Sequence, residues 1–258
     1  MSFRIVIPAR YQATRLPGKP LRDLAGKPLI QHVHERAVES GAETIIIATD
    51  DERIRATAEG FGATVCMTRS DHRNGTERLG EVIEKMAWPD EAVIVNLQGD
   101  EPLMPPDCLR QVAQLLDAHP DCAMATLYAG IDDPEDMFDP HVVKLVTNRD
   151  DEALYFSRAA IPWWREVFND APQVELADPP TAFKRHIGLY AYRAGFGRNY
   201  AHLQPSPLEQ MESLEQLRAL WHGYHIAVAE AVQLPPPGVD TEGDLERVRR
   251  QLTSQKAG

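Results

Sequence analysis

The chain has 258 residues, of which 43% are hydrophobic, and carries a formal net charge of −12 at neutral pH. That length can bury a core in one large α/β domain, with or without an insertion. The acidic balance argues against non-specific binding to nucleic acid or to an anionic membrane, because both need a positively charged surface. Since there is no charged leader before a long apolar segment, and no stretch long enough to cross a bilayer, we expect a cytoplasmic protein.

A basic loop follows the first predicted strand. The apolar run over 5–7 is typical of a buried parallel strand, and Pro8 ends it because proline cannot donate the next ladder hydrogen bond. Arg10, Arg15 and Lys19 follow within a few residues, and a Pro-Gly turn stands directly before Lys19. Ligands bind at the carboxyl edge of open parallel sheets, so we predict a phosphate-binding loop. A solvated basic loop is the alternative, and neither the Walker nor the dinucleotide glycine spacing is present.

Apolar runs and segments of helical period then alternate along the chain. This alternation predicts a three-layer α/β fold around a mostly parallel, doubly wound sheet. The predicted strands are 44–49, 63–67, 92–97, 123–129, 142–147 and 226–231, and the predicted helices are 29–40, 51–60 and 75–86, with later ones from Ser206 and Thr241. Capping boxes predict both later starts, Ser206 with Glu209 and Thr241 with Asp244. We expect the helix from Ser206 to bury its apolar side: Leu208, Met211, Leu214, Leu217, Leu220 and Trp221.

Two further loops follow predicted strands. Asn74-Gly75 is an ordinary turn signal, but Thr76 and the amides of the next helix could hold a nucleoside. Asp100 and Glu101 come shortly after the predicted strand over 92–97, and Gly99 before them permits close backbone approach. Two acids in this position suit a hard cation such as Mg²⁺. A helix-capping carboxylate is the alternative reading. Asp240, which precedes the last predicted helix, is a candidate partner for Asp100.

The sequence pattern changes over 150–204, where strand-like and helix-like segments no longer alternate and where Trp163-Trp164 occurs. We therefore predict an inserted subdomain outside the sheet, within a single domain over 1–258. Within it, the segment over 184–192 alternates, so His186, Tyr190 and Tyr192 share one face. His186 is read as a structural histidine or as the lining of a polyhydroxylated pocket. The residue pattern alone makes Glu215 and Gln216 solvated helix-surface residues, and makes the three cysteines reduced structural thiols.

Eight stretches together resemble one family, the 3-deoxy-manno-octulosonate cytidylyltransferases, also called CMP-Kdo synthetases. They follow the family's order over nearly the whole chain. The stretches are Ile7-Pro8-Ala9-Arg10-Tyr11, Thr14-Arg15-Leu16-Pro17-Gly18-Lys19-Pro20, Gly75-Thr76-Glu77-Arg78, Val95-Asn96-Leu97-Gln98-Gly99-Asp100-Glu101-Pro102, Leu154-Tyr155-Phe156-Ser157-Arg158, Arg185-His186-Ile187-Gly188-Leu189-Tyr190, Gln204-Pro205-Ser206-Pro207-Leu208-Glu209 and Gly238-Val239-Asp240-Thr241.

The resemblance implies transfer of CMP from CTP to 3-deoxy-D-manno-octulosonate (Kdo), with release of pyrophosphate, for lipopolysaccharide synthesis in a Gram-negative bacterium. It makes Lys19, Arg10, Asp100 and Asp240 the expected catalytic residues, and Asp100 and Asp240 the expected Mg²⁺ ligands. The expected nucleotide contacts are Pro8, Ala9, Arg10, Arg15, Lys19, Asn74, Gly75 and Thr76. The expected sugar-acid contacts are Gln98, Arg158, His186, Tyr190, Glu215 and Gln216, so the resemblance replaces the structural reading of His186, Glu215 and Gln216. The family is typically dimeric, and the aromatic insertion suggests an interface.

In the implied mechanism the anomeric hydroxyl of Kdo attacks the α-phosphorus and pyrophosphate leaves in line, without a covalent enzyme intermediate. A second metal is expected only with both substrates present. The sequence departs from the family at Arg73-Asn74, Trp163-Trp164-Arg165 and Gly243. Two alternatives stay open: a cytidylyltransferase for another 2-keto sugar acid such as sialic acid, and a catalytically silent nucleotide-binding sensor.

Overall fold

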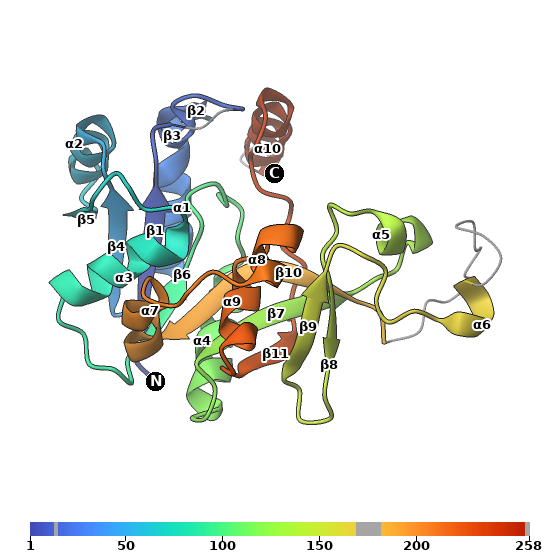
Figure 1. Ribbon diagram of the computed structural model, residues 1–258. Helices are drawn as coiled ribbons and strands as arrows, with labels where there is room; N and C mark the ends of the chain where they lie inside the picture. Colours follow the sequence, from blue (N-terminus) through green and yellow to red (C-terminus); the bar gives the residue numbers. More distant parts are fainter. Residues whose placement is uncertain (13–14, 169–181, 256–258) are drawn as a thin grey trace.

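The structure is a computed structural model that describes residues 1–12, 15–168 and 182–255. Within these residues, a sheet in the order β11-β7-β10-β6-β1-β4-β5 is extended by β8 and β9 (Figure 1). Seven of its strands run in one direction: β1 (Arg4–Ala9), β4 (Thr44–Thr49), β5 (Thr64–Met67), β6 (Val93–Asn96), β7 (Met124–Gly130), β8 (Lys144–Thr147) and β11 (Ile226–Glu230). The strands that run in the opposite direction are β9 (Ala153–Ser157) and β10 (Lys184–Arg193). A short hairpin, β2 (Asp23–Leu24) and β3 (Lys27–Pro28), stands apart from this sheet.

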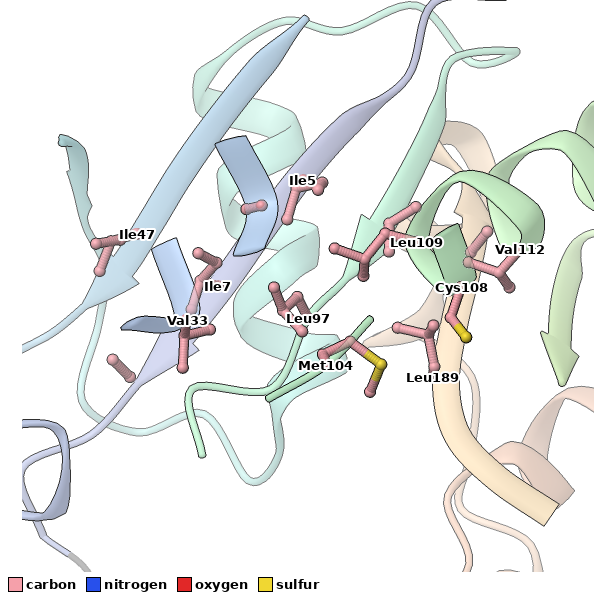
Figure 2. Close-up of a cluster of buried hydrophobic side chains, with 14 of the residues drawn as sticks. Ile5, Ile7, Val33, Ile47, Leu97, Met104, Cys108, Leu109, Val112 and Leu189 are labelled. Carbon is pink, nitrogen blue, oxygen red and sulfur yellow. The ribbon is translucent and has the colours of Figure 1, made fainter. Parts of the chain in front are cut away.

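Helices cover both faces of the sheet. They are α1 (Leu29–Glu39), α2 (Glu52–Gly60), α3 (Gly75–Lys85), α4 (Pro106–Ala118), α5 (Pro134–Phe138), α6 (Arg165–Phe168), α7 (Ala194–Tyr200), α8 (Pro207–Glu212), α9 (Gln216–Trp221) and α10 (Glu242–Gln255), with a 3₁₀ turn, η1, at Lys19–Leu21. On one face, Ile5 and Ile7 of β1 pack with side chains of α1 and α4 (Figure 2). On the other face, Val6 packs with side chains of α3, α7 and α9. The predicted three-layer, mostly parallel α/β fold is therefore confirmed.

The strand with the strongest sequence signal, β1, lies in the interior of the sheet, between β4 and β6. The β-branched run of β1 pairs with β4 on one side and β6 on the other, placing Ile5 beside Ile45 and Val95. Ile5, Val6 and Ile7 are fully buried because helices cover both faces of a parallel strand. The carboxyl ends of the parallel strands β1 and β6 lie at the same edge of the sheet, and the loops that follow these strands start there.

The prediction that 150–204 lies outside the sheet is wrong where the structure describes that region. β10 lies between β6 and β7 and runs antiparallel to both, and β9 joins the sheet through β8. An antiparallel strand needs no crossover helix, so the missing strand-helix rhythm did not mean that the segment left the sheet. Residues 169–181 of the predicted insertion lie outside the described residues. Its role as a substrate and dimerisation subdomain stays a prediction.

The predicted helix from Ser206 is two helices. Its capping box with Glu209 is confirmed, but Ser213 adopts the left-handed conformation at φ 53° and ends α8 before α9 begins. Because the two helices do not share one axis, the apolar side that we expected to be buried is partly exposed. Met211 is 83% exposed and Trp221 is 55% exposed. Cys66, Cys108 and Cys122 are buried and not in disulfides, as predicted. None of the described helices is long and apolar enough to span a bilayer.

Candidate active site

Two loops meet at the carboxyl edge of the sheet. The loop after β6 crosses directly over the end of β1, so closely that a side-chain carbon at Gly99 would lie 2.6 Å from the carbonyl oxygen of Pro8. Only glycine allows this approach. A cavity of about 190 Å³ opens beside it, lined by Pro8, Ala9, Arg10, Gln12, Lys19, Pro20, Gln98, Gly99 and Asp100. Six of the sequence-predicted site residues thus line one cavity.

Lys19 connects the basic loop to the two predicted metal ligands. Gly18 adopts the left-handed conformation at φ 66°, as the Pro-Gly turn predicts, and directs Lys19 inward. Lys19 Nζ donates to Asp100 Oδ2 at 2.7 Å, to Asp240 Oδ1 at 3.1 Å and to the carbonyl oxygen of Val239 at 3.0 Å. Burial opposes the charge on Lys19, but the two carboxylates outweigh it and raise the pKa of Lys19. Asp100 and Asp240, far apart in the sequence, therefore face a single cation.

This donor set fits Mg²⁺. Two carboxylates already surround one positive charge, the Lys19 ammonium, and Arg15 adds an ion pair to Asp240 at 3.1 Å. In the described part of the chain no three metal-ligating side chains form a cluster. Mg²⁺ commonly takes one or two carboxylates and completes its shell with water and substrate phosphate. Beyond Asp100 a larger hollow of about 630 Å³ is lined by Arg15, Asp240 and residues around them.

Glu101 is a third acid at this edge. Burial, together with the charges of Asp100 and Asp240, raises the pKa of Glu101 to about 8. Its carboxyl group is therefore largely protonated at neutral pH. A protonated carboxyl group is a poorer ligand for a hard cation than the neighbouring Asp100 carboxylate.

The N-terminus of α3 lies beside Pro8 and Gln98, two residues that line this cavity. Asn74 caps the helix by accepting from the Glu77 amide at 2.9 Å, so Asn74-Gly75 is a helix start rather than a simple turn. Arg10 donates to the carbonyl oxygens of His72 and Asn74. A carbon added at Gly75 would lie 3.4 Å from Pro8 Cγ and 3.7 Å from Gln98 Nε2. The free amides of a helix N-terminus suit an anionic or polar ligand here.

Thr76 is not open to this cavity. It is 1% exposed, and its hydroxyl hydrogen-bonds Glu215 Oε1 at 3.0 Å and the Tyr192 hydroxyl at 3.1 Å. A predicted nucleotide contact and a predicted sugar contact are thus bonded to each other. Burial raises the pKa of Glu215, and the Thr76 hydrogen bond opposes that shift.

Glu215 and Gln216 are not solvated surface residues, so the reading from helical pattern alone is wrong. Gln216 is 3% exposed and its Nε2 has no hydrogen-bond partner among the described residues. A buried donor without a partner costs roughly 1–3 kcal/mol, which favours a ligand group as its partner.

His186 and Tyr190 stand together on β10. Their rings lie 5.3 Å apart, and Phe156 packs edge-on to His186 at 5.0 Å. His186 Nε2 shares a hydrogen bond of 3.0 Å with Thr126 Oγ1. Burial lowers the pKa of His186 to about 3, so this imidazole is neutral at physiological pH.

Arg158 is held separately from the other predicted sugar contacts. Its guanidinium donates to the carbonyl oxygens of Glu212 and Pro140, each at 2.8 Å. Its backbone amide donates to the Glu212 carboxylate at 2.9 Å. The structure therefore ties Arg158 to the end of α8 rather than to Glu215 or His186.

Sequence reasoning gave no role to Asn96 or Tyr192. Asn96 is fully buried, and neither of its side-chain polar atoms forms a hydrogen bond of normal geometry with any residue that the structure describes, although it lies close to Tyr192. A carbon added at Gly75 would lie 3.7 Å from Asn96 Nδ2. One signal was available, since Asn96 is a polar residue inside an otherwise apolar strand.

Comparisons with known proteins agree with the fold and with the family resemblance. The family model described as Cytidylyltransferase matches residues 4–226. A 3-deoxy-manno-octulosonate cytidylyltransferase of Methylococcus capsulatus is 54% identical over 253 residues, covering 98% of each chain. The protein of the same name from Idiomarina loihiensis is 56% identical, covering 97% of this chain and 98% of that one.

Solved structures extend this likeness. The structure of CMP:2-keto-3-deoxy-manno-octonic acid synthetase complexed with CTP has a TM-score of 0.88 at 42% identity, covering 99% of this chain and 100% of that one. A nucleotidyl transferase from Methanothermobacter has a TM-score of 0.63 at 16% identity, covering 98% of this chain and 99% of that one. At that identity the second likeness concerns the fold alone.

Proposed function

Because this chain belongs to the 3-deoxy-manno-octulosonate cytidylyltransferases, we propose that it transfers CMP from CTP to the anomeric hydroxyl of Kdo and releases pyrophosphate. One observation carries the assignment to the described site. Lys19 stands between Asp100 and Asp240 at the sheet edge where the α3 N-terminus and Arg10 also meet. This grouping offers cations and helix amides for phosphates, and carboxylates for a metal ion.

The residues at this edge would mainly position the reactants. Lys19, Arg10 and Arg15 would contact the CTP phosphates, while Pro8, Ala9, Asn74 and Gly75 would contact the nucleoside. Asp100 and Asp240 would hold Mg²⁺, which when bound offsets phosphate charge and lowers the proton affinity of the attacking hydroxyl. Phosphoryl transfer needs little covalent chemistry from the protein, so orientation and charge neutralisation account for most of the catalysis.

The sugar acid would lie toward β10 and α9. The unpartnered Nε2 of Gln216 supports this, because it offers a buried donor for a sugar oxygen. His186, whose imidazole is neutral, would contact hydroxyl groups together with Tyr190 and Glu215. Gln98 lines the cavity that also contains Lys19 and Asp100. Arg158 remains a proposed carboxylate contact on the family resemblance, and binding would require it to leave Glu212.

We also propose a cytoplasmic homodimer that serves lipopolysaccharide synthesis in a Gram-negative bacterium. Leu154, Met211 and Trp221 are 59%, 83% and 55% exposed, and they stand on β9, α8 and α9, which are in contact with one another. Covering them would remove apolar surface from water. Sedimentation equilibrium of the wild type and of Met211→Glu tests this, since a dimer that uses this face should dissociate in the variant.

Pyrophosphate release tests the main proposal. The purified chain is incubated with CTP and Mg²⁺, alone, with Kdo or with sialic acid, and Lys19→Met serves as the inactive control. Release that depends on Kdo is the expected result. Release with sialic acid only would move the assignment to a different 2-keto sugar acid, and no release with either would favour a nucleotide-binding sensor.

A further inference from the structure

The carboxylate of Glu215 reaches away from its own helix. Glu215 is the N-cap residue of α9, yet its side chain accepts no hydrogen bond from the first turn of that helix. It accepts instead from Thr76 Oγ1 at 3.0 Å, on the first turn of α3. Meanwhile the Tyr200 hydroxyl donates to the backbone carbonyl of Glu215 at 3.1 Å. The residue is therefore fixed at both its backbone and its side chain.

The proton count gives this network a direction. The Thr76 hydroxyl has a single proton and donates it to Glu215 Oε1. Thr76 Oγ1 then accepts from Tyr192, whose hydroxyl lies 3.1 Å away. Burial raises the pKa of Tyr192 well above its ordinary value, so Tyr192 keeps its proton and can donate it. The hydrogen bonds run from Tyr192 to Thr76 to Glu215.

We propose that Thr76 and Tyr192 are positioning residues that hold Glu215 as an oriented carboxylate acceptor for the sugar acid. The Thr76 side chain is thus a support for the sugar site rather than a nucleotide contact, because both of its hydrogen-bonding partners are protein groups and almost none of it is exposed. This inference rests on the proposed function. It also links the first turn of α3, at the nucleotide edge, to the sugar side of the site.

Burial raises the pKa of Glu215, and the Thr76 hydrogen bond is the largest of the effects that oppose this rise. Arg218 lies nearby, but it donates to Glu209 at 2.8 Å and also faces Glu77 at 3.9 Å, so its charge is shared with two other acids. The titratable and charged groups around Glu215 are Glu77 on α3, Tyr190 and Tyr192 on β10, Tyr200 on α7, Glu209 on α8 and Arg218 on α9. Two of these groups are acids whose charge adds to the effect of burial in raising the pKa of Glu215.

The test separates the two substrates. Steady-state rates are measured for Thr76→Val, Thr76→Ser and Tyr192→Phe while Kdo and CTP are varied independently, from pH 6 to pH 9. Thr76→Val removes the donor, and a hydrogen bond to a charged group is worth about 1.5–3 kcal/mol, so we expect KM for Kdo to rise at least about 10-fold. KM for CTP should stay within about 2-fold. Thr76→Ser keeps the hydroxyl and should restore KM for Kdo, and Tyr192→Phe should fall between the two.

The pH profile supplies a readout that a loss of packing would not give. Without the Thr76 hydroxyl, Glu215 should protonate at higher pH, so the acidic limb of kcat/KM for Kdo should move to higher pH in Thr76→Val. Thr57→Val is the matched control, because Thr57 is partly exposed on α2 and, among the described residues, its hydroxyl bonds only the Arg53 carbonyl of its own helix.

Two results would overturn the proposal: a rise of KM for CTP alone, or a Thr76→Ser enzyme as impaired as Thr76→Val. If Thr76→Val does not fold, Thr76→Ser and Tyr192→Phe carry the same comparison. A Tyr192→Phe enzyme with unchanged KM for Kdo and an unchanged pH profile would then overturn it. A wild type without pyrophosphate release would instead refute the proposed function, so the two failures are distinct.

Discussion

Removing the Lys19 ammonium should make the protein more responsive to Mg²⁺. In the structure this ammonium occupies the space between Asp100 and Asp240. A metal ion that binds both carboxylates must either displace the Lys19 ammonium or share the carboxylates with it. Lys19→Met should therefore weaken the protein without metal, but should increase the stabilisation that Mg²⁺ gives.

The size of the effect follows from exposure and distance. Two unit charges 4 Å apart interact by about 4 kcal/mol at an effective dielectric of about 20. The Asp100 and Asp240 side chains are 32% and 50% exposed, so solvent screens both pairs, and each is worth about 1 kcal/mol. Lys19→Met should then lower the free energy of unfolding by about 2 kcal/mol without metal, because the Asp100 and Asp240 carboxylates lose the cation that they share.

Urea unfolding with and without Mg²⁺ measures this directly. A ligand at 100 times its Kd stabilises the folded state by about 2.7 kcal/mol, so Mg²⁺ should recover the loss in Lys19→Met and give the wild type less. Lys27→Met is the matched control, since Lys27 pairs with Glu35 at 2.6 Å, where no predicted metal ligand takes part. Equal stabilisation of wild type and Lys19→Met by Mg²⁺ would refute the reasoning, and so would a Mg²⁺ gain that survives Asp240→Asn in the Lys19→Met background.

Three further changes test other parts of the structure. Asn96→Leu should leave the free energy of unfolding unchanged or raise it by up to about 2 kcal/mol, because it removes a buried amide that has no hydrogen bonds among the described residues. The rate of pyrophosphate release should fall, and a clear loss of stability in urea unfolding would contradict this reasoning. Burial acts to raise the pKa of Glu81, but hydrogen bonds from Lys85, the Arg69 amide and His72 outweigh it and lower the pKa from 4.5 to about 2, so Glu81 stabilises the fold above pH 4.5 and loses that contribution as the pH falls toward 2. Glu81→Gln should cost about 1–2 kcal/mol at pH 7, allowing for screening, and a difference from wild type in urea unfolding that failed to narrow below pH 4.5 would refute this assignment. Ser206→Ala should cost about 1 kcal/mol through loss of the α8 cap, measured in the same way, with Ser254→Ala on the exposed end of α10 expected to have no effect.

The sequence predicted those parts of the fold that depend on local signals. The apolar run at Ile5 and the capping box at Ser206 act within a few residues, and both appear in the structure as expected. The helix break at Ser213 was missed, because no glycine or proline marks it and the backbone there is held by the packing of α8 and α9. The position of β10 was missed because strand order depends on contacts between distant segments.

In the site, Asp100 and Lys19 were predicted from their charge and from their positions after predicted strands. Asp240 was predicted as a candidate partner for Asp100 from its position before the last helix, but its hydrogen bond with Lys19 was not predicted, because that contact depends on how the segment before α10 folds back over the sheet edge. The burial of Glu215 was hidden for a related reason. Helical period assumed one straight helix, whereas the turn at Ser213 directs the start of α9 toward α3.

The position of β10 also affects how the chain can fold. β6 is made early in the sequence and β7 soon after, but the strand that hydrogen-bonds both is contributed much later. Until β10 arrives, β6 and β7 each present an unpaired edge, and closing such distant pairs is slow. During synthesis the N-terminal half would therefore expose edges that favour pairing with other chains. The strand that carries His186 and Tyr190 is thus also the one that joins β6 to β7, so this part of the sugar side forms only when the two parts of the sheet are joined.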